Sequence, residues 1–400
     1  MRNKSVIRTL IFLIVMSIWT ASCTSSLKDT ESPAYLNWPY PEGAPEFFAP
    51  DVVSIEGRFE MGFTMSPDGR TIAFGVSDEK DTSLTQIYFM QREEDGWSQP
   101  TSEALHDNTN TFFPMFAPNG DFYYARAVPG ADTDIWKGKL QNGKITSSQP
   151  LAEAVNTQYR EAGHGLSKDG LFLFTSNRDQ AQPWGGDIYQ WLENGSVDKV
   201  EGLSSDWDEE SLFLSPDGDY ILFQSWKPEH KSKHDLYISY KTKDGSWSNP
   251  MRLPDAINSK EIEQRPFVSP DKEFLFFSRM SVTQVGNETL VDSDIYWVRT
   301  NQVFSPFVYN PVSSIEVKAD DDFVAFIPGD LFRNGSGKGA PVIRATLVDD
   351  SPLPDGFKFD LKKMWLKGNL NGEKSMTIKL TASNGKGLTA SHQLTLVAKK

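Results

Sequence analysis

Four glutamates precede a repeated turn at the same spacing, each six residues before the first residue of the turn. They are Glu60, Glu161, Glu209 and Glu263, and Thr111 has the same place before a fifth turn. Carboxylates bind sugar hydroxyls or cations, and a pair of them can act as acid and base in glycoside hydrolysis. A structural role explains the spacing more simply, because a repeated residue can accept the same backbone N–H bonds in every repeat.

Three basic residues near these glutamates depart from the repeat, namely Arg160, His164 and Arg265. A repeated structure does not require them, so they are the irregular candidates for a ligand site. His164 fits a general base or a hydrogen-bonded core histidine, and the sequence leaves both interpretations open. No catalytic residue is assigned, and no metal or cofactor is expected. The predicted ligand-binding residues are Glu60, Arg160, Glu161, His164, Glu209, Glu263 and Arg265.

Five short turns are the elements that position these residues. Proline presets φ at the second position, aspartate or asparagine caps the turn, and glycine accepts a positive φ at the fourth. The first residues of the turns follow one another at steps of 51, 50, 48 and 54 residues. The turns are Ser66-Pro67-Asp68-Gly69, Ala117-Pro118-Asn119-Gly120, Ser167-Lys168-Asp169-Gly170, Ser215-Pro216-Asp217-Gly218 and Ser269-Pro270-Asp271-Lys272.

An apolar run precedes each turn, a second run follows it, and a short triplet around Ile or Leu marks a third strand. A period of about 50 residues with about four strands is typical of a β-propeller. The run before each turn would be the innermost strand, so equivalent positions are predicted to form a ring around a central channel. The triplets are Gln86-Ile87-Tyr88, Asp134-Ile135-Trp136, Asp187-Ile188-Tyr189, Asp235-Leu236-Tyr237 and Asp294-Ile295-Tyr296.

The turns and triplets resemble the WD40-like PD40 repeat of TolB-type β-propellers over roughly residues 55–310. The resemblance implies an all-β chain with a five-bladed propeller within residues 51–310, and residues 36–57 leave a sixth, atypical blade open. It also implies a binding role in an envelope complex, as TolB-like proteins have. Propellers carry many unrelated functions, so the fold alone selects none of them.

Residues 318–400 lose the repeat and show short alternating strands. The stretch from Pro352 to Asp360 and the hairpin from Thr381 to Ser391 resemble a dystroglycan-type, cadherin-like domain. This resemblance implies an immunoglobulin-like β-sandwich after the propeller. The acidic triplet 320–322 is more simply explained as a solvated turn than as a metal site.

The first 22 residues have the pattern of a signal peptide. Arg2, Lys4 and Arg8 precede an apolar run from Leu10 to Trp19, which is too short to span a membrane. The only cysteine of the chain, Cys23, follows three small residues. This arrangement resembles a bacterial lipobox.

Lipidation of Cys23 would anchor the protein to a membrane without spanning it. Thr24 follows the cysteine instead of aspartate, which favours the outer membrane by resemblance to the enterobacterial sorting rule. Residues 23–50 are then predicted to be a tether followed by an extended segment. The expected location is the bacterial cell envelope, with the side of the membrane left open.

The formal net charge of −14 argues against nucleic acid as the main partner. Trp184, Trp207 and Trp226 lie outside the repeated core positions, where they would either stack on sugar rings or cover loops. The sequence therefore predicts an envelope lipoprotein that binds a protein or a glycan without catalysis. The alternative is a carbohydrate-active enzyme, a glycoside hydrolase or polysaccharide lyase, that uses the channel carboxylates with His164 and Arg265.

Overall fold

The computed structural model describes residues 35–78, 84–94, 96–102, 109–127, 132–141, 144–179, 186–226, 234–285, 288–318 and 321–399. Within these residues the protein is built from β-strands, which confirms the prediction of an all-β chain. One short helix, α1 (Thr300–Val303), is present in the described ranges, and no helix there is long and apolar enough to cross a membrane. The signal segment and Cys23 lie outside the described residues.

Five groups of antiparallel strands, here called the five sheets, follow one another along residues 58–299, and the first and fifth of them are joined into one nine-stranded sheet. Their first strands are β2 (Arg58–Met65), β7 (Thr111–Phe116), β11 (Glu161–Leu166), β15 (Asp208–Leu214) and β19 (Ile262–Val268). The second strands are β3 (Thr71–Asp78), β8 (Phe122–Ala127), β12 (Phe172–Ser176), β16 (Tyr220–Trp226) and β20 (Phe274–Val285). The third strands are β4 (Gln86–Glu93), β9 (Thr133–Gln141), β13 (Asp187–Trp191), β17 (Asp235–Tyr240) and β21 (Glu288–Arg299).

The outermost strand of each sheet is more variable in length. In the first sheet, β5 (Gly96–Trp97) and β6 (Thr101–Ser102) both pair with β4. In the next three sheets the outer strands are β10 (Lys144–Pro150), β14 (Val197–Lys199) and β18 (Met251–Arg252). In the fifth sheet, β1 (Glu46–Phe47) comes from the segment before the first sheet and pairs with β21. The outer strand of the fifth sheet therefore comes from residues 46–47, within the segment that the sequence predicts to be a tether and extended stretch.

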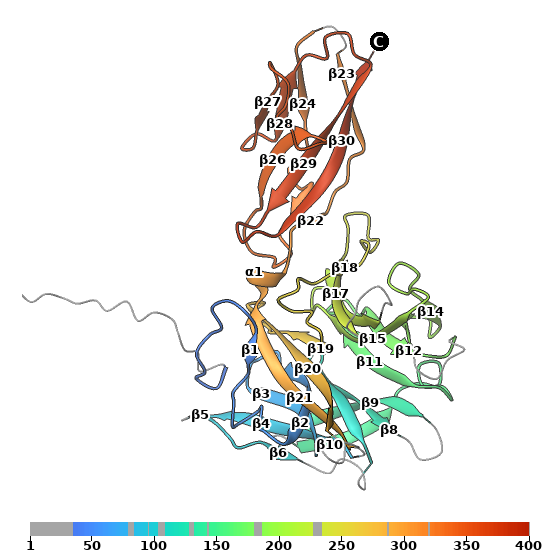
Figure 1. The fold of residues 1–400 in the computed structure, drawn as a ribbon. Coiled ribbons are helices and arrows are strands. Elements are labelled where there is room, and N and C mark those ends of the chain that lie inside the picture. Colours follow the sequence, from blue (N-terminus) through green and yellow to red (C-terminus); the bar gives the residue numbers. More distant parts are fainter. Residues whose placement is uncertain are drawn as a thin grey trace, which may run out of the picture.

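The first strands of the five sheets contact one another in order, and the last of them also contacts the first. A bridge between Phe59 of β2 and Ser293 of β21 joins the first and fifth sheets directly. Figure 1 shows these sheets splayed around the place where β2, β11, β15 and β19 approach one another. The arrangement is propeller-like, and it brings equivalent positions of the five first strands to one central region.

The repeated turns form as their composition predicts. In the fourth turn, Gly218 has a φ of 68°, and the Ser215 hydroxyl accepts the N–H groups of Asp219 and Tyr220 at 2.9 and 3.1 Å. The fifth turn places Lys272 in the same left-handed region, with a φ of 61°. Because the serine binds the backbone beyond the turn, the start of the second strand is fixed relative to the end of the first.

Adjacent sheets pack face to face through aromatic and branched side chains. One cluster joins the third and fourth sheets around Leu173, Phe223 and Tyr237, and another joins the second and third around Tyr123 and Phe174. These side chains are almost fully buried. Their burial supplies most of the favourable free energy that holds the sheets in register.

The C-terminal residues form two further sheets around a separate core. The larger sheet contains β23 (Ser314–Lys318), β30 (Thr389–Lys399), β29 (Ser375–Ser383) and β26 (Val342–Leu347). The smaller sheet contains β24 (Phe323–Phe326), β28 (Trp365–Gly368) and β27 (Lys358–Asp360). A short pair, β22 (Phe307–Val308) and β25 (Phe332–Arg333), lies between these sheets and the propeller-like part. Figure 1 shows the C-terminal sheets beyond α1, at one side of the five-sheet body.

Candidate functional site

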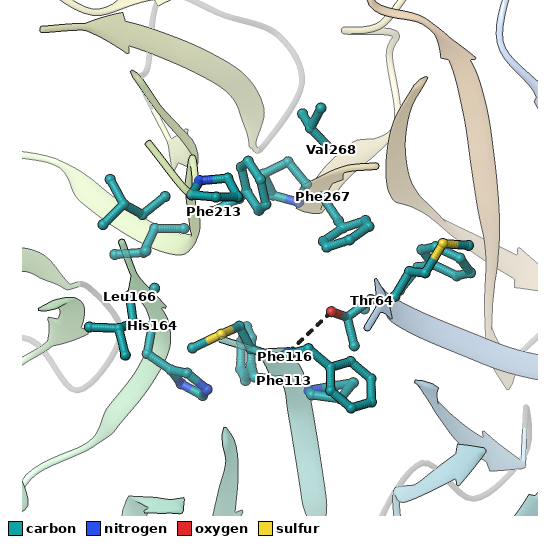
Figure 2. A pocket seen from close by; sticks show the side chains of 18 of the residues that line it. Thr64, Phe113, Phe116, His164, Leu166, Phe213, Phe267 and Val268 are labelled. Atoms are coloured by element: carbon teal, nitrogen blue, oxygen red, sulfur yellow. Dashed lines mark hydrogen bonds between the residues drawn. The ribbon is translucent and has the colours of Figure 1, made fainter. Parts of the chain in front are cut away.

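A cavity of about 190 Å³ lies between the first strands of the five sheets. All five strands contribute to its wall, and they do so with equivalent positions of the repeat. Figure 2 shows side chains from different strands around this space, including Thr64, Leu166, Phe213 and Phe267. The cavity therefore depends on the way the sheets are arranged and on no single strand.

One rim of the cavity is formed by the second residues of the five turns. Four of these residues are prolines. In the third turn the residue is Lys168, which forms an ion pair of 2.8 Å with Asp217 on the neighbouring turn. Below this rim the wall is mainly aromatic and aliphatic. A mostly apolar wall of this kind is typical of small-molecule sites. The prolines are Pro67, Pro118, Pro216 and Pro270.

A β-bulge interrupts each first strand four residues before its turn. Four of the five residues at this position have a left-handed backbone, which non-glycine residues rarely adopt. The remaining residue, Gly163 of the third sheet, does not have a positive φ. Because a bulge shifts the alternation of side chains, it turns this position toward the cavity. The four are Gly62 (φ 62°), Phe113 (φ 53°), Ser211 (φ 47°) and Arg265 (φ 53°).

His164 lies in the cavity wall and is 3% exposed. Its Nδ1 is 2.8 Å from the carbonyl oxygen of Ala162, so the neutral ring carries its proton on Nδ1. Its Nε2 is buried and has no hydrogen-bond partner of normal geometry among the described residues. Burial lowers the pKa of His164 to about 4, partly opposed by the carbonyls of Ala162 and Tyr123. The ring is therefore neutral near pH 7.

Arg265 lies in the same wall and is partly buried. Its guanidinium carbon is 4.1 Å from the centre of the Phe113 ring and 5.9 Å from that of Phe112. Its Nη1 contacts the sulfur of Met61, and its Nε is buried without a hydrogen-bond partner in the described part of the chain. Burial and the nearby Arg160 cation lower the pKa of Arg265 to about 9.

The predicted glutamates do not line the cavity; each is at most 1% exposed and binds the loop that leads into its own strand. Glu161 accepts the backbone N–H and the hydroxyl of Thr157, both at 2.8 Å. Glu209 accepts the same two groups of Ser205 at 2.9 and 2.5 Å, and Glu263 those of Ser259 at 3.1 and 2.6 Å. This repeated pattern matches the structural explanation of their spacing.

Arginines complete this arrangement in three of the sheets. Arg178 lies 3.2 Å from Glu161, and Arg279 lies 2.8 Å from Glu263. Glu60 accepts the N–H of Ile55 and pairs with Arg58. Burial raises the pKa of Glu60 to about 8 and that of Glu209 to about 7, and it also raises the pKa of Glu263.

Arg160 lies away from the cavity wall and pairs with Glu210 of the neighbouring first strand. The structure therefore brings together two of the seven predicted ligand-binding residues in the cavity, His164 and Arg265. It adds residues that sequence reasoning missed, above all Phe113 and Ser211. The position four residues before each turn holds glycine, phenylalanine, glycine, serine and arginine in turn, so no common residue type marks it in the sequence.

Two of the three tryptophans suggested for glycan contact lie side by side. Trp207 and Trp226 are each 38% exposed, and their ring centres are 5.7 Å apart in an edge-to-face arrangement. They are on the fourth sheet, at the end of β15 that is remote from its turn. Trp184 lies outside the described residues.

No profile of a known protein family matches the chain, and no curated protein sequence matches it. Among solved structures it is similar to an exo-β-1,3-galactanase from Clostridium thermocellum, with 12% identity, 86% of this chain and 91% of that one covered, and a TM-score of 0.40. It is also similar to a gluconolactonase from Xanthomonas campestris, with 15% identity, 74% and 96% covered, and a TM-score of 0.37.

A puromycin-hydrolysing peptidase from Mycobacterium tuberculosis is similar at 14% identity and a TM-score of 0.36. That similarity covers 56% of this chain and 34% of the peptidase, so the chain spans about a third of the length of that enzyme. Because these TM-scores are all below 0.5, the similarities do not assign an activity to the chain.

Proposed function

We propose that this chain is a lipid-anchored binding protein of the bacterial cell envelope that holds a small ligand in its central cavity. In this proposal the five sheets are the blades of a five-bladed propeller, and the C-terminal sheets form an immunoglobulin-like sandwich. The observation that carries it is the cavity itself. Five first strands surround it, and two of its polar residues, His164 and Arg265, keep buried nitrogen atoms without hydrogen-bond partners in the described chain.

Unpaired buried polar groups are costly, and proteins keep few of them without a functional reason. Both residues line the cavity, although these two nitrogen atoms themselves lie beneath its surface and do not face the open space. The bulged, left-handed backbone at Phe113, Ser211 and Arg265 supports the same conclusion, because strained residues concentrate at ligand sites.

A binding role is favoured over a carbohydrate-active enzyme because the candidate carboxylates are already engaged. The oxygens of Glu161, Glu209 and Glu263 accept hydrogen bonds from loop residues inside the sheets. A glycosidase needs two carboxyl groups that face the substrate. Five blades are favoured over six because residues 46–47 complete the fifth sheet and do not begin another one.

Binding of a glycan is a second candidate, and the pair of Trp207 and Trp226 favours it. Exposed aromatic rings stack on sugar rings, and these two lie together on the fourth sheet. A Trp207→Ala and Trp226→Ala double variant should lose binding to a glycan array if this candidate is right. Unchanged glycan binding by that variant would contradict it.

The proposed function is tested with benzyl alcohol as the probe. This molecule is neutral, so the test does not assume that the natural ligand is charged. Saturation-transfer NMR on the purified protein should detect binding. Leu166→Trp fills the cavity and should abolish the signal, whereas Leu361→Trp on the exposed surface of the C-terminal part should not. Equal signals from the three proteins would show that the cavity is not the site.

The anchor has its own test, because Cys23 lies outside the described residues. Metabolic labelling with an alkynyl fatty acid should mark the wild-type protein and not a Cys23→Ser variant. The variant should also move from the membrane fraction to the soluble fraction. Labelling of the variant would contradict the lipoprotein proposal and leave the cavity proposal intact.

A further inference from the structure

The charged residues in the cavity wall are all basic, although the whole chain has a formal net charge of −14. Among the described residues the lining contains Lys168, His164 and Arg265, and it contains no aspartate or glutamate. Lys168 is paired with Asp217 at the rim, and His164 is neutral near pH 7. Arg265 is therefore the one lining residue whose charge is neither paired nor neutralised.

No carboxylate lies within ion-pair distance of Arg265 in the described part of the chain. The acidic residue that acts on it most is Glu210, and the carboxylate of Glu210 is paired with Arg160. The aromatic faces of Phe112 and Phe113 stabilise the Arg265 cation only in part. Because an uncompensated cation is costly to bury, this position favours an anion from outside the chain.

The shape and walls of the cavity limit what that anion can be. A cavity of about 150 Å³ lined by apolar side chains holds one benzene ring, so the volume here of about 190 Å³ suits a single ring with one substituent. The wall between the proline rim and Arg265 is largely apolar, with Phe116, Leu166 and Phe213 among its residues. A strongly hydrated or polyhydroxylated molecule would lose its hydrogen bonds to water there.

We propose that the ligand is a small apolar monocarboxylate, whose ring or short acyl chain fills the cavity while its carboxylate binds the guanidinium of Arg265. This inference rests on the proposed function, because it names the ligand class of the same cavity. The planar guanidinium matches the geometry of a carboxylate and can bind both of its oxygens.

The bulge at Arg265 supports this assignment. Arginine has a left-handed backbone here, with a φ of 53°, a conformation that residues other than glycine rarely adopt. The first sheet has glycine at the equivalent position, Gly62, so the fold itself does not require a long cationic side chain there. A ligand contact explains why the strained position carries one.

The experiment compares three probes by isothermal titration calorimetry. Benzoate has the ring and the charge, benzyl alcohol has the ring alone, and acetate has the charge alone. The wild-type protein should bind benzoate at least tenfold more tightly than either of the others. Arg265→Met should weaken benzoate at least tenfold and change the affinity for benzyl alcohol less than twofold, whereas Arg265→Lys should keep most of the benzoate affinity.

Arg344→Met is the matched control, because Arg344 is exposed on the C-terminal sheets and the same substitution is made. It should bind all three probes like the wild type. Retained binding of benzyl alcohol by Arg265→Met shows that this variant folds. Equal affinities for benzoate and benzyl alcohol, or an equal loss of both in Arg265→Met, would overturn the carboxylate assignment alone. A wild-type protein that binds neither aromatic probe would overturn the proposed function as well.

Discussion

The guanidinium carbon of Arg265 lies 4.1 Å from the centre of the Phe113 ring, although β2 separates their two strands around the cavity. The Arg265 side chain passes over Gly62, where an added Cβ would lie 3.4 Å from its Cδ. Phe113 and Arg265 occupy the same position of the repeat and share a φ of 53°. Two bulges thus bring a cation and an aromatic face together at the centre of the molecule.

This contact predicts an energetic coupling between the two side chains. Phe113→Leu should lower the free energy of unfolding by about 1–3 kcal/mol, because it removes a mostly buried ring and a cation–π contact. In a double-mutant cycle with Arg265→Met, urea denaturation should give a coupling of about 0.5–2 kcal/mol. Additive effects would mean that the ring and the guanidinium pack nearby without stabilising one another.

The same two residues show why the cavity was hard to predict. The turns were predictable because their chemistry is local, as in Ser215-Pro216-Asp217-Gly218. Simple alternation from a turn back to its glutamate points the glutamate toward the channel. The bulge between the two shifts that alternation, and it leaves no strong local signature when the bulged residue is phenylalanine, serine or arginine.

His164 and Arg265 were identified for a different reason, since they depart from the residue types that the other repeats have at the same positions. Departure from a repeat indicates a function better than the repeat itself does, because repeated residues usually perform a structural task in every unit. Glu161 and Arg160 illustrate the limit of this rule. Arg160 is irregular too, yet it pairs with Glu210 outside the cavity.

Glu161 should contribute to stability and not to ligand binding. Its carboxylate accepts two hydrogen bonds from Thr157 and one from Ser176 at 2.7 Å, and it lies 3.2 Å from Arg178. Glu161→Gln removes the charge that Arg178 faces and should lower the free energy of unfolding by about 1–3 kcal/mol. The exposed Glu193→Gln on the same sheet is the matched control and should change it by less than about 0.5 kcal/mol.

Both variants should bind benzyl alcohol like the wild type, measured by the same NMR experiment as before. If Glu161→Gln lost ligand binding at a temperature where the variant is folded, the result would show that Glu161 does take part in binding.

The raised pKa of Glu209 predicts that the stability of the folded protein depends on pH. Burial raises its pKa to about 7, while hydrogen bonds from Ser205 and Ser225 oppose the shift. The folded protein therefore binds a proton at Glu209 over a range of pH in which the unfolded chain, with a usual value near 4.5, does not. This stabilisation is fully present below pH 4.5 and is lost as the pH rises through about 7.

The contribution of Glu209 to the free energy of unfolding should fall by about 1–3 kcal/mol between pH 5 and pH 8. Glu209→Gln, which stays neutral, should show a smaller loss over the same range in urea denaturation. Some loss should remain, because burial also raises the pKa of Glu60, to about 8. The same pH dependence in the variant and the wild type would show that Glu209 is ionised in the folded protein at pH 5.

Gly163 should be irreplaceable because two backbones meet there. A Cβ at this position would lie 2.8 Å from both the backbone nitrogen of Leu212 and the Cα of Ser211, closer than real Cβ atoms approach. These are main-chain atoms of β15, so they cannot rotate away. Gly163→Ala should push β11 and β15 apart and lower the free energy of unfolding by about 1–3 kcal/mol.

The same displacement should open the cavity wall at Ser211, so Gly163→Ala should also weaken benzyl alcohol binding. Gly329→Ala is the matched control, because nothing lies within 4 Å of its added Cβ. Its melting temperature should stay close to that of the wild type, and its ligand binding should be unchanged. If Gly163→Ala has the same melting temperature as Gly329→Ala, then β11 and β15 can separate without loss of stability. The shape of the cavity would then not depend on close contact between these strands.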